Sequence, residues 1–285
     1  MAQTVKIISD STCDLSKDLL EKYDISILPL HILLGETEYR DGVDITPEEI
    51  FRWSDENKTT PKTSAPSMTE AMEVMKPFLD EGREIICFSI SDSMSTSGNV
   101  MRLAAEDLEA SDRVTVINSA NLSTGIGLQV IQAAILSAEG KTRAQITAAI
   151  EEIRPRVRAS FTVDTLTYLY RGGRCNAVAA LAGTMLKLHP RIVVEDGAMD
   201  ASKKYRGKLS SVILSYTKDM EDDLKNAVPD RVFITHSGCD REIVESVRSY
   251  LESLGIFNEI LETRAGGVIS SHCGPGTLGV LFIEK

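Results

Sequence analysis

The feature that most constrains the fold is a repeated order of short apolar run, polar turn and helical pattern in the first half of the chain. Residues 5–9 (VKIIS) and 84–91 (EIICFSIS) are rich in β-branched and apolar side chains, and each run opens into a turn of acids and hydroxyls before a helical pattern. Strands buried on both faces are typical of a parallel sheet flanked by helices, whose ligands bind beyond the carboxyl ends of the strands. We therefore expect a site at the turns that contain Asp10, Ser95 and Ser119.

The second half of the chain predicts another α/β unit. A fresh strand starts at 156–163, and further strand candidates lie at 191–195, 231–235, 258–262 and 280–283. We predict an N-terminal α/β domain over residues 1–155, with a mostly parallel sheet, and a C-terminal α/β domain over residues 156–285. The boundary is approximate, and segments can pass from one domain to the other.

Composition and charge exclude several classes of protein. The 285 residues carry 42 acidic and 31 basic side chains, a net charge of −11, which argues against nucleic-acid binding through phosphate contacts. The five cysteines are scattered and contain no CxxC pair, so we expect neither a zinc site nor a disulfide framework, and a reducing cytoplasm as the compartment. No apolar run approaches the roughly 18 residues of a membrane span, and the first residues lack a signal-peptide pattern. We therefore expect neither export nor stable membrane insertion.

The segment TSAPS (63–67) carries hydroxyls ahead of a stiff corner, because its proline restricts the preceding Ala65 to an extended conformation. The hydroxyls of Thr63 and Ser64 could therefore face a ligand. The alternative is that both face solvent, while Ser67 caps the following helix in a capping box with the glutamate three residues later.

The segment MSTSGN (94–99) follows the most apolar strand and precedes a helix. Hydroxyls and backbone N–H groups at a helix N-terminus favour an anion, so the segment predicts an anion site. The alternative is simple helix capping by Ser95 or Ser97. Either serine could also be a nucleophile, but the chain has no GxSxG motif there, so a hydrolase is disfavoured.

His272 lies in a glycine-rich turn, SHCGPGTLG (271–279), that holds its backbone rigidly, whereas His31, His189 and His236 lie in unremarkable sequence. A ligand contact and a structural role are both open for His272. No neighbouring metal ligands accompany it, so we expect neither a metal site nor a cofactor.

Positive charge is concentrated in one segment. Residues 154–208 contain eleven Lys or Arg and four acids, a net charge of +7, so the remainder of the chain carries −18. Such a segment is either a docking face for an anionic partner or phosphate, or a solvated face with local salt bridges.

Seven segments resemble, in order and spacing, the motifs of the DegV family of bacterial fatty-acid-binding proteins. They are IISDSTCDL at 7–15, DGVDIT at 41–46, TSAPS at 63–67, SDSMSTSGN at 91–99, DTLTYLYRGGR at 164–174, KKYRGK at 203–208 and HCGPGTLGV at 272–280. The resemblance implies a two-domain α/β protein that holds one long-chain fatty acid, such as a palmitate-like acid, between its domains. It also implies a protein without catalysis of its own, which presents the carboxylate to a separate fatty acid kinase.

The resemblance implies a role for particular polar residues. The positions that hydrogen-bond the carboxylate are matched by Thr63, Ser95 and His272, with helix-end amides around Ser95 and Thr96 assisting. Two departures stand out, because the family often has Gln where this chain has Ala65 and Gly where it has Thr96. The headgroup geometry is expected to differ accordingly.

Basic positions that the family uses in contact with the kinase are matched by Arg171 or Arg174 and by Arg206. A different interpretation is a small-molecule kinase or phosphotransferase subunit, related in architecture to the dihydroxyacetone kinases, in which His272 contacts a polar substrate.

Overall fold

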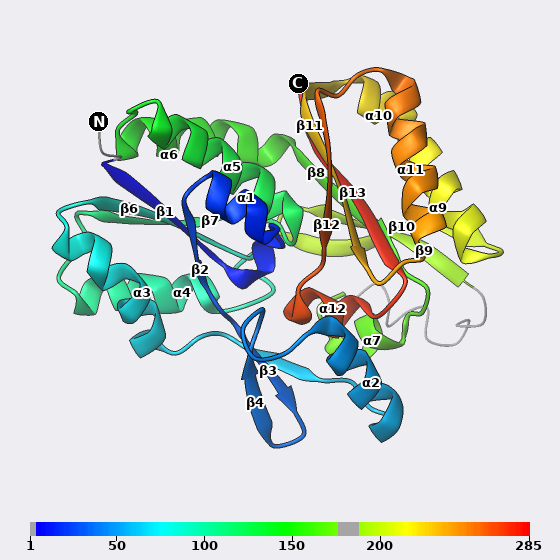
Figure 1. Cartoon of the computed structure of the whole chain (residues 1–285), viewed down its shortest axis with the longest axis horizontal. Helices are drawn as coiled ribbons and strands as arrows, with labels where there is room; N and C mark the ends of the chain where they lie inside the picture. The colour runs from blue at the N-terminus through cyan, green and yellow to red at the C-terminus, as the bar shows by residue number, and fades with distance from the viewer. Residues whose placement is uncertain (1–3, 176–187) are drawn as a thin grey trace.

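The computed structural model describes residues 4–175 and 188–285, and the chain is built around two main sheets (Figure 1). The first sheet has the order β2-β1-β6-β7, and all of its neighbouring strands are parallel. Its strands are β1 (Val5–Asp10), β2 (Ile25–Leu28), β6 (Glu84–Ser89) and β7 (Val114–Asn118). The parallel sheet expected from the apolar runs is therefore confirmed.

Helices cover both faces of this sheet, which is why the central strands β1 and β6 are buried along nearly their whole length. On one face, α3 and α4 pack through a buried cluster that includes Met75 and Met101. The other face packs against α5, with α1 and α6 beside it. The helices are α1 (Lys17–Lys22), α3 (Met68–Asp80), α4 (Ser97–Asp107), α5 (Thr124–Ala138) and α6 (Arg143–Ile153).

The second sheet has the order β10-β9-β8-β13-β11-β12, and only β11 and β12 run parallel within it. Its strands are β8 (Val157–Thr162), β9 (Leu188–Glu195), β10 (Ala198–Arg206), β11 (Ala227–Ser237), β12 (Glu259–Arg264) and β13 (Thr277–Glu284). Helices α9 (Leu209–Lys218) and α11 (Arg241–Leu254) cover its outer face, and α10 (Glu221–Lys225) lies near β13.

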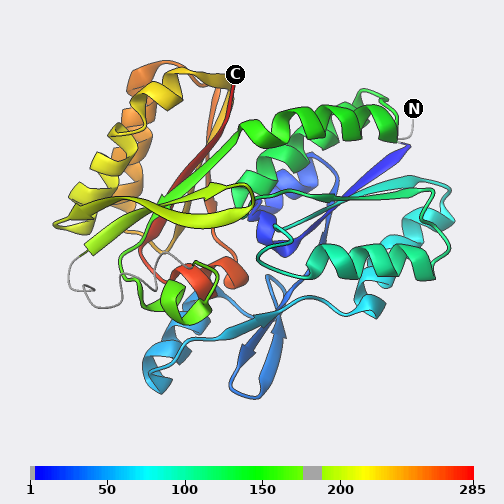
Figure 2. The ribbon, with the colours of Figure 1, turned by 180° about the vertical axis from the view of Figure 1, so that it is seen from behind.

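Helix α5 lies between the two sheets and joins them into one core. It is apolar on nearly every side, which is the pattern of a fully buried helix. Its Ile126 and Ile131 belong to the same buried cluster as Ile86 of the first sheet and Phe161 of the second. The hairpin of β9 and β10 also extends from the second sheet to the first part of the chain (Figure 2). At its tip, the carbonyl of Gly197 accepts a hydrogen bond of 2.6 Å from Ser91 Oγ, which follows β6.

A third, three-stranded sheet, which the sequence did not predict, lies below the two main ones in Figure 1. It has the order β4-β3-β5, with β3 (His31–Leu34), β4 (Thr37–Arg40) and β5 (Lys62–Ser64). Helix α2 (Pro47–Asn57) follows β4, capped by Thr46 in a capping box with Glu49. This unit packs against α12 (Gly267–Cys273), which comes from the end of the chain, while α7 (Thr167–Gly172) packs on α12 as well. Residues distant in the sequence thus meet at α12.

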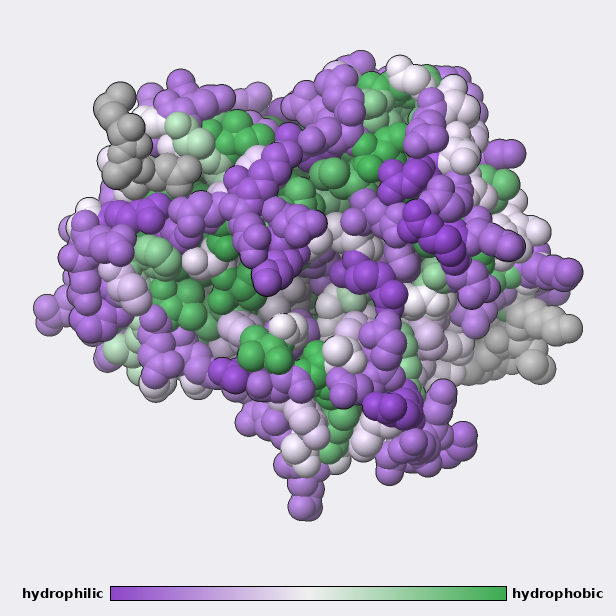
Figure 3. All heavy atoms as spheres, viewed as in Figure 1, coloured by the Kyte–Doolittle hydropathy of each residue, from purple (hydrophilic) through white to green (hydrophobic). Residues whose placement is uncertain are grey.

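The surface is mostly hydrophilic on the face seen in Figure 3, where apolar side chains show only in separate patches. Among residues 4–175 and 188–285, no helix is long and apolar enough to span a bilayer. No disulfide joins the five cysteines, all of which lie in the described residues.

Candidate functional site

A cavity of about 480 Å³ lies where the turn after β6, strand β5, helix α12 and strand β10 come together. It is lined by Leu30, Thr63, Ser64, Ala65, Ile90, Asp92, Ser93, Met94, Ser95, Thr96, Leu122, Arg174, Met199, Val268, Ile269, His272 and Cys273. The lining combines residues from both predicted domains. It also brings together all four residues that the sequence assigned to a carboxylate, namely Thr63, Ser95, Thr96 and His272.

Thr63 and His272 form the most defined contact in this cavity. Thr63 Oγ1 lies 2.8 Å from His272 Nε2, although 209 residues separate them in the chain. Thr63 is the central residue of β5, and His272 lies in the last turn of α12, which packs on β3 and β5. Thr63 is therefore partly buried against His272, whereas Ser64 is exposed and Ser67 caps α3 in the capping box that the sequence predicted.

The surroundings of His272 keep its ring neutral. Burial and the nearby positive charge of Arg174 lower the pKa of His272 from 6.5 to about 4. Its Nδ1 is buried and has no hydrogen-bond partner in the described part of the chain. Gly172 of α7 lies against this nitrogen, and a Cβ at position 172 would lie only 2.4 Å from it. Thr63 thus contacts one nitrogen of the ring, and the absence of a side chain at Gly172 leaves the space that the other nitrogen occupies.

The other hydroxyls of the cavity lie at the start of α4. This helix begins at Ser97, three residues earlier than the helical pattern beginning at Val100 suggested, so Ser95 and Thr96 lie directly before its first turn. Ser95 Oγ accepts a hydrogen bond of 3.2 Å from the backbone N–H of Ser97. The hydroxyl of Ser97 points away, donating to Asp10 Oδ2 at 2.9 Å. Ser97 is therefore not part of the lining, whereas Ser95 and Thr96 line the cavity together with Asp92, Ser93 and Met94 of the same turn.

Thr96 and Ala65, the two departures from the family pattern, are compatible with the backbone of the segments in which they lie. Thr96 has φ −91° and ψ 8°, a conformation open to any residue, so its side chain does not strain the turn. Ala65 lines the cavity with a methyl group where a longer side chain would reduce its volume. Both residues alter the shape of the polar end of the cavity without disturbing its backbone.

A narrow apolar gap continues from the polar cavity between the two domains. The gap and the cavity share Leu122, Ile269 and Cys273, and the gap runs on to Phe161 and Leu281 of the second sheet. Its free volume is only about 20 Å³. These five residues come from four different elements or turns, and only Cys273 lies in one of the seven motifs, so sequence reasoning did not identify them as a tail-lining set.

The three arginines assigned to a partner lie in different places. Arg174 is exposed and contributes to the cavity wall, so it is also a cation close to His272. Arg171 is exposed on α7 and donates to the carbonyl of Lys58 at 3.5 Å, while Arg206 is exposed at the end of β10. No carboxylate of the described residues lies within ion-pair distance of any of the three.

Much of the positively charged segment is neutralised by acids. Its members Arg154, Arg158 and Arg191 line a larger, open groove of about 830 Å³, whose lining does not include His272. Each forms an ion pair there or beside it, with Glu151, Glu284 and Asp223 respectively. The segment is therefore not one continuous basic face.

The remaining histidines have partners outside the cavity. His31 lies between Glu38 and Glu70, His189 Nδ1 contacts the carbonyl of Val163, and His236 lies 3.5 Å from Glu262. The described residues contain no group of three or more His, Cys, Asp or Glu side chains arranged to hold a metal ion. The cavity residues are therefore suited to hydrogen bonding rather than to metal binding.

Comparison with known proteins shows the family of this chain. A family model described as "Uncharacterised protein, DegV family" matches residues 4–285. A DegV domain-containing protein of Caldanaerobacter subterraneus subsp. tengcongensis is 31% identical to this chain, with 99% of this chain and 100% of the relative aligned.

Solved structures give the same result. A DegV family protein from Thermus thermophilus, described with fatty acid binding, has a TM-score of 0.91 and 31% identity and covers 99% of this chain and 100% of its own. A stearic acid-binding protein from Eubacterium ventriosum has a TM-score of 0.85 and 32% identity, covering 99% and 98%.

Proposed function

The chain belongs to the DegV family, and from this premise we propose that it binds one long-chain fatty acid, with the carboxylate in the polar cavity and the tail in the apolar gap. The observation that carries the proposal is the contact of 2.8 Å between Thr63 and His272 at the wall of a cavity that continues into an apolar gap. Relatives with the same fold are described as binding fatty acids, including stearic acid.

The polar end is suited to a single carboxylate. His272 is neutral at pH 7, so its Nε2–H can donate to Thr63 Oγ1 while the threonine hydroxyl donates to the ligand. Ser95 and the N-terminus of α4 supply further donors, and a helix N-terminus favours negative charge. Hydroxyls and a neutral ring select the head without the large desolvation cost of a buried lysine.

The tail supplies most of the affinity. A sixteen-carbon acid has fourteen CH₂ groups, and at about 0.8 kcal/mol each they contribute roughly 11 kcal/mol of gross transfer free energy. Each charge-assisted hydrogen bond of the head contributes about 1.5–3 kcal/mol before the carboxylate is desolvated. The gap of about 20 Å³ has to widen for a tail to enter, so part of the transfer free energy is spent on separating the walls.

The test is denaturing extraction of the purified protein followed by mass spectrometry, together with titration by acids and alcohols of equal chain length. We expect a long-chain acid at near-stoichiometric yield and a preference for the acid over the alcohol. Absence of any bound acid, even after acid has been offered, would overturn the proposal.

We further propose that the protein presents its fatty acid to a separate fatty acid kinase and has no catalytic activity of its own. Arg171, Arg174 and Arg206 support this part because they are exposed and free of ion pairs in the described residues, unlike Arg158 and Arg191. Exposed cations accelerate encounter with an acidic partner. The cytoplasm stays the predicted compartment.

The test combines a fatty acid kinase with the loaded protein. Arg206→Glu is expected to lower the rate of acyl phosphate formation with little change in fatty acid binding. Arg158→Glu, in the groove that Arg154 and Arg191 also line, is the control. Turnover of a polyol with ATP by this chain alone would instead support the dihydroxyacetone-kinase interpretation.

A further inference from the structure

Two sequence motifs have no role in the cavity itself, and both contribute a buried aspartate. Asp14 comes from IISDSTCDL and Asp41 from DGVDIT, and they are 6% and 2% exposed. Neither lines the cavity, and neither forms an ion pair with a described residue. Buried carboxylates are costly unless hydrogen bonds replace their water.

The hydrogen bonds of both aspartates lead to the start of α12. Asp14 Oδ1 accepts a hydrogen bond of 2.8 Å from the backbone N–H of Gly266, and Asp41 Oδ1 accepts one of 2.7 Å from the backbone N–H of Gly267. The second oxygen of each is held as well, because Ser123 donates to Asp14 Oδ2 at 2.5 Å and Ser11 donates to Asp41 Oδ2 at 2.8 Å. Two carboxylates of the N-terminal part thus hold consecutive amides of the C-terminal part.

The two glycines make this close approach possible. A Cβ at Gly267 would lie 2.5 Å from Ile32 Cδ1 and 2.9 Å from Asp41 Oδ1, and a Cβ at Gly266 would lie 3.1 Å from Asp14 Oδ1. Ser123 adopts φ 52° and ψ −145°, an unusual conformation for a serine, while its hydroxyl bonds Asp14. The local backbone is therefore shaped around the two carboxylates.

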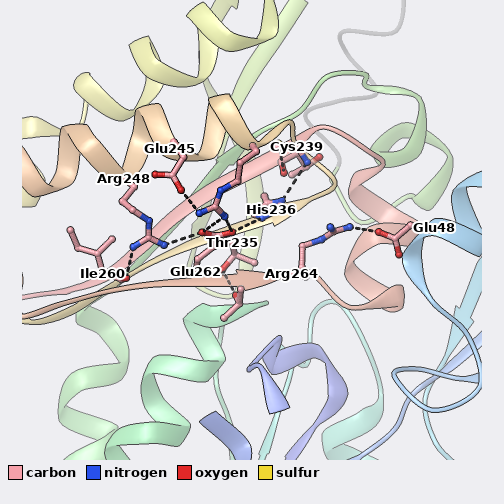
Figure 4. A network of polar contacts seen from close by, with 12 residues as sticks. Glu48, Thr235, His236, Cys239, Glu245, Arg248, Ile260, Glu262 and Arg264 are labelled. Carbon is pink, nitrogen blue, oxygen red and sulfur yellow. Dashed lines mark hydrogen bonds and ion pairs between the residues drawn. The ribbon is translucent and has the colours of Figure 1, made fainter. Parts of the chain in front are cut away.

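An ion pair fixes the same junction from the side. Figure 4 shows Arg264, the last residue of β12, pointing to Glu48 in the first turn of α2, and the two side chains are paired. Residues 264, 266 and 267 are therefore all bound to segments from the first fifty residues. These contacts set where α12 begins.

We propose that Asp14 and Asp41 are positioning residues for the carboxylate site, because they fix α12 so that His272 meets Thr63 at the wall of the cavity. This inference rests on the proposed fatty acid function. Gly267 and His272 are only five positions apart in the chain, and helix α12 also supplies Val268, Ile269 and Cys273 to the cavity. A shift at the start of so short a helix moves its far end by a similar distance, enough to break a bond of 2.8 Å.

The experiment uses the full chain with Asp14→Ala and Asp41→Ala, which remove both acceptors, and Asp14→Asn and Asp41→Asn, which keep one amide oxygen for the glycine N–H. Asp44→Ala, three residues from Asp41 and exposed, is the matched control. Titration with an acid and an alcohol of equal chain length measures the preference for the acid. The NMR signal of the His272 ring reports the position of the ring.

We expect the alanine variants to lose about tenfold in preference for the acid, with alcohol binding little changed, because one charge-assisted hydrogen bond is misplaced. The His272 signal is expected to move, and the asparagine variants to recover most of the preference. Folded alanine variants with the wild-type preference and an unmoved His272 signal would overturn the inference.

If both alanine variants fail to fold, Gly266→Ala decides, since its Cβ presses on Asp14 Oδ1 without removing a carboxylate. A lost preference supports the inference, and an unchanged preference overturns it. Failure of the wild-type protein to prefer the acid would instead contradict the proposed function.

Discussion

The two halves of the carboxylate cavity are built in different ways. In one half, Thr63 and His272 come from the centre of β5 and the end of α12, and their contact is enclosed by Gly172. In the other half, Ser95 and Thr96 follow one another in the turn that joins β6 to α4. The first half depends on long-range packing, and the second depends on a local strand-turn-helix unit.

This difference has an energetic consequence. Loss of the Thr63 hydroxyl leaves a buried ring nitrogen without a partner, whereas loss of the Ser95 hydroxyl, in a less enclosed turn, removes a longer, local bond of 3.2 Å to the N–H of Ser97. We therefore expect the enclosed half to be the more sensitive to substitution. The following four predictions run from the largest effect to the smallest.

The largest effect is expected for Gly172→Ala. The new Cβ would lie 2.4 Å from His272 Nδ1, so the ring has to move and its bond to Thr63 is lost. We expect the preference for an acid over an alcohol of equal length to fall by more than about tenfold. Displacement of a fluorescent fatty acid by the acid and by the alcohol measures this preference.

The adjacent Gly173→Ala is the matched control. Gly173 has φ 66° and open space around its Cβ position, so alanine there costs about 1–2 kcal/mol of backbone strain without touching His272. Equal losses of acid preference in the two variants would show that the His272 contact is not the cause.

Thr63→Val is expected to have the next largest effect. Valine keeps the shape of threonine and its fit to a strand but removes the hydroxyl that meets His272. A loss of about 1.5–3 kcal/mol, or roughly tenfold to a hundredfold in acid affinity, is expected, with alcohol affinity reduced less. Thr69→Val, exposed on α3, should change neither affinity. Calorimetric titration of both ligands measures the difference, and a parallel loss for both would refute it.

Ser95→Ala is expected to cost less, about threefold in acid affinity, or roughly 0.6 kcal/mol. The backbone amides at the start of α4 remain, so the site keeps part of its attraction for an anion. Exposed Ser111→Ala is the control, and the same titration measures both. A loss larger than that of Thr63→Val would reverse the ranking of the two halves.

The smallest effect is expected from pH in the neutral range. Since burial and Arg174 lower the pKa of His272 to about 4, the ring is neutral at both pH 6 and pH 8, and acid affinity should be flat between them. An NMR titration of the ring gives the midpoint. For His31, burial alone would lower the pKa, but hydrogen bonds to the carboxylates of Glu70 and Glu38 raise it above 6.5, so its signal serves as an internal contrast.

At lower pH, the lowered pKa of His272 determines the direction in which this residue changes the stability of the fold. Between pH 6.5 and about 4 the unfolded chain binds a proton at His272 that the folded chain does not, so this residue lowers the free energy of unfolding as pH falls through that window. An acid affinity that fell steadily from pH 6 to pH 8 would instead indicate a charged histidine as the ligand group.

The local half of the site could be predicted from the sequence because its information is local. An apolar run followed by hydroxyls and a helical pattern fixes a strand, a turn and a helix, and the carboxyl end of a parallel strand is where ligands bind. The start of α4 was predicted at Val100 instead of Ser97, because glycine is a poor helix former and Gly98 therefore indicated a turn; in the structure Gly98 lies in the helix, where a Cβ would come within 2.6 Å of Ser89 Oγ. For Thr63 and His272 the residues alone left a ligand contact and a structural role both open, and only the motifs that resemble a family assigned them to one carboxylate.

The sequence by itself determined the parallel sheet, the capped helices and the polar segments, because hydrophobic period, capping and turn chemistry act over a few residues. Only the tertiary structure decided that Thr63 meets His272, that Asp14 and Asp41 hold the start of α12, and that Arg154, Arg158 and Arg191 of the positive segment pair with acids. Contacts across more than two hundred residues depend on how whole elements pack, and no short stretch of sequence contains that information.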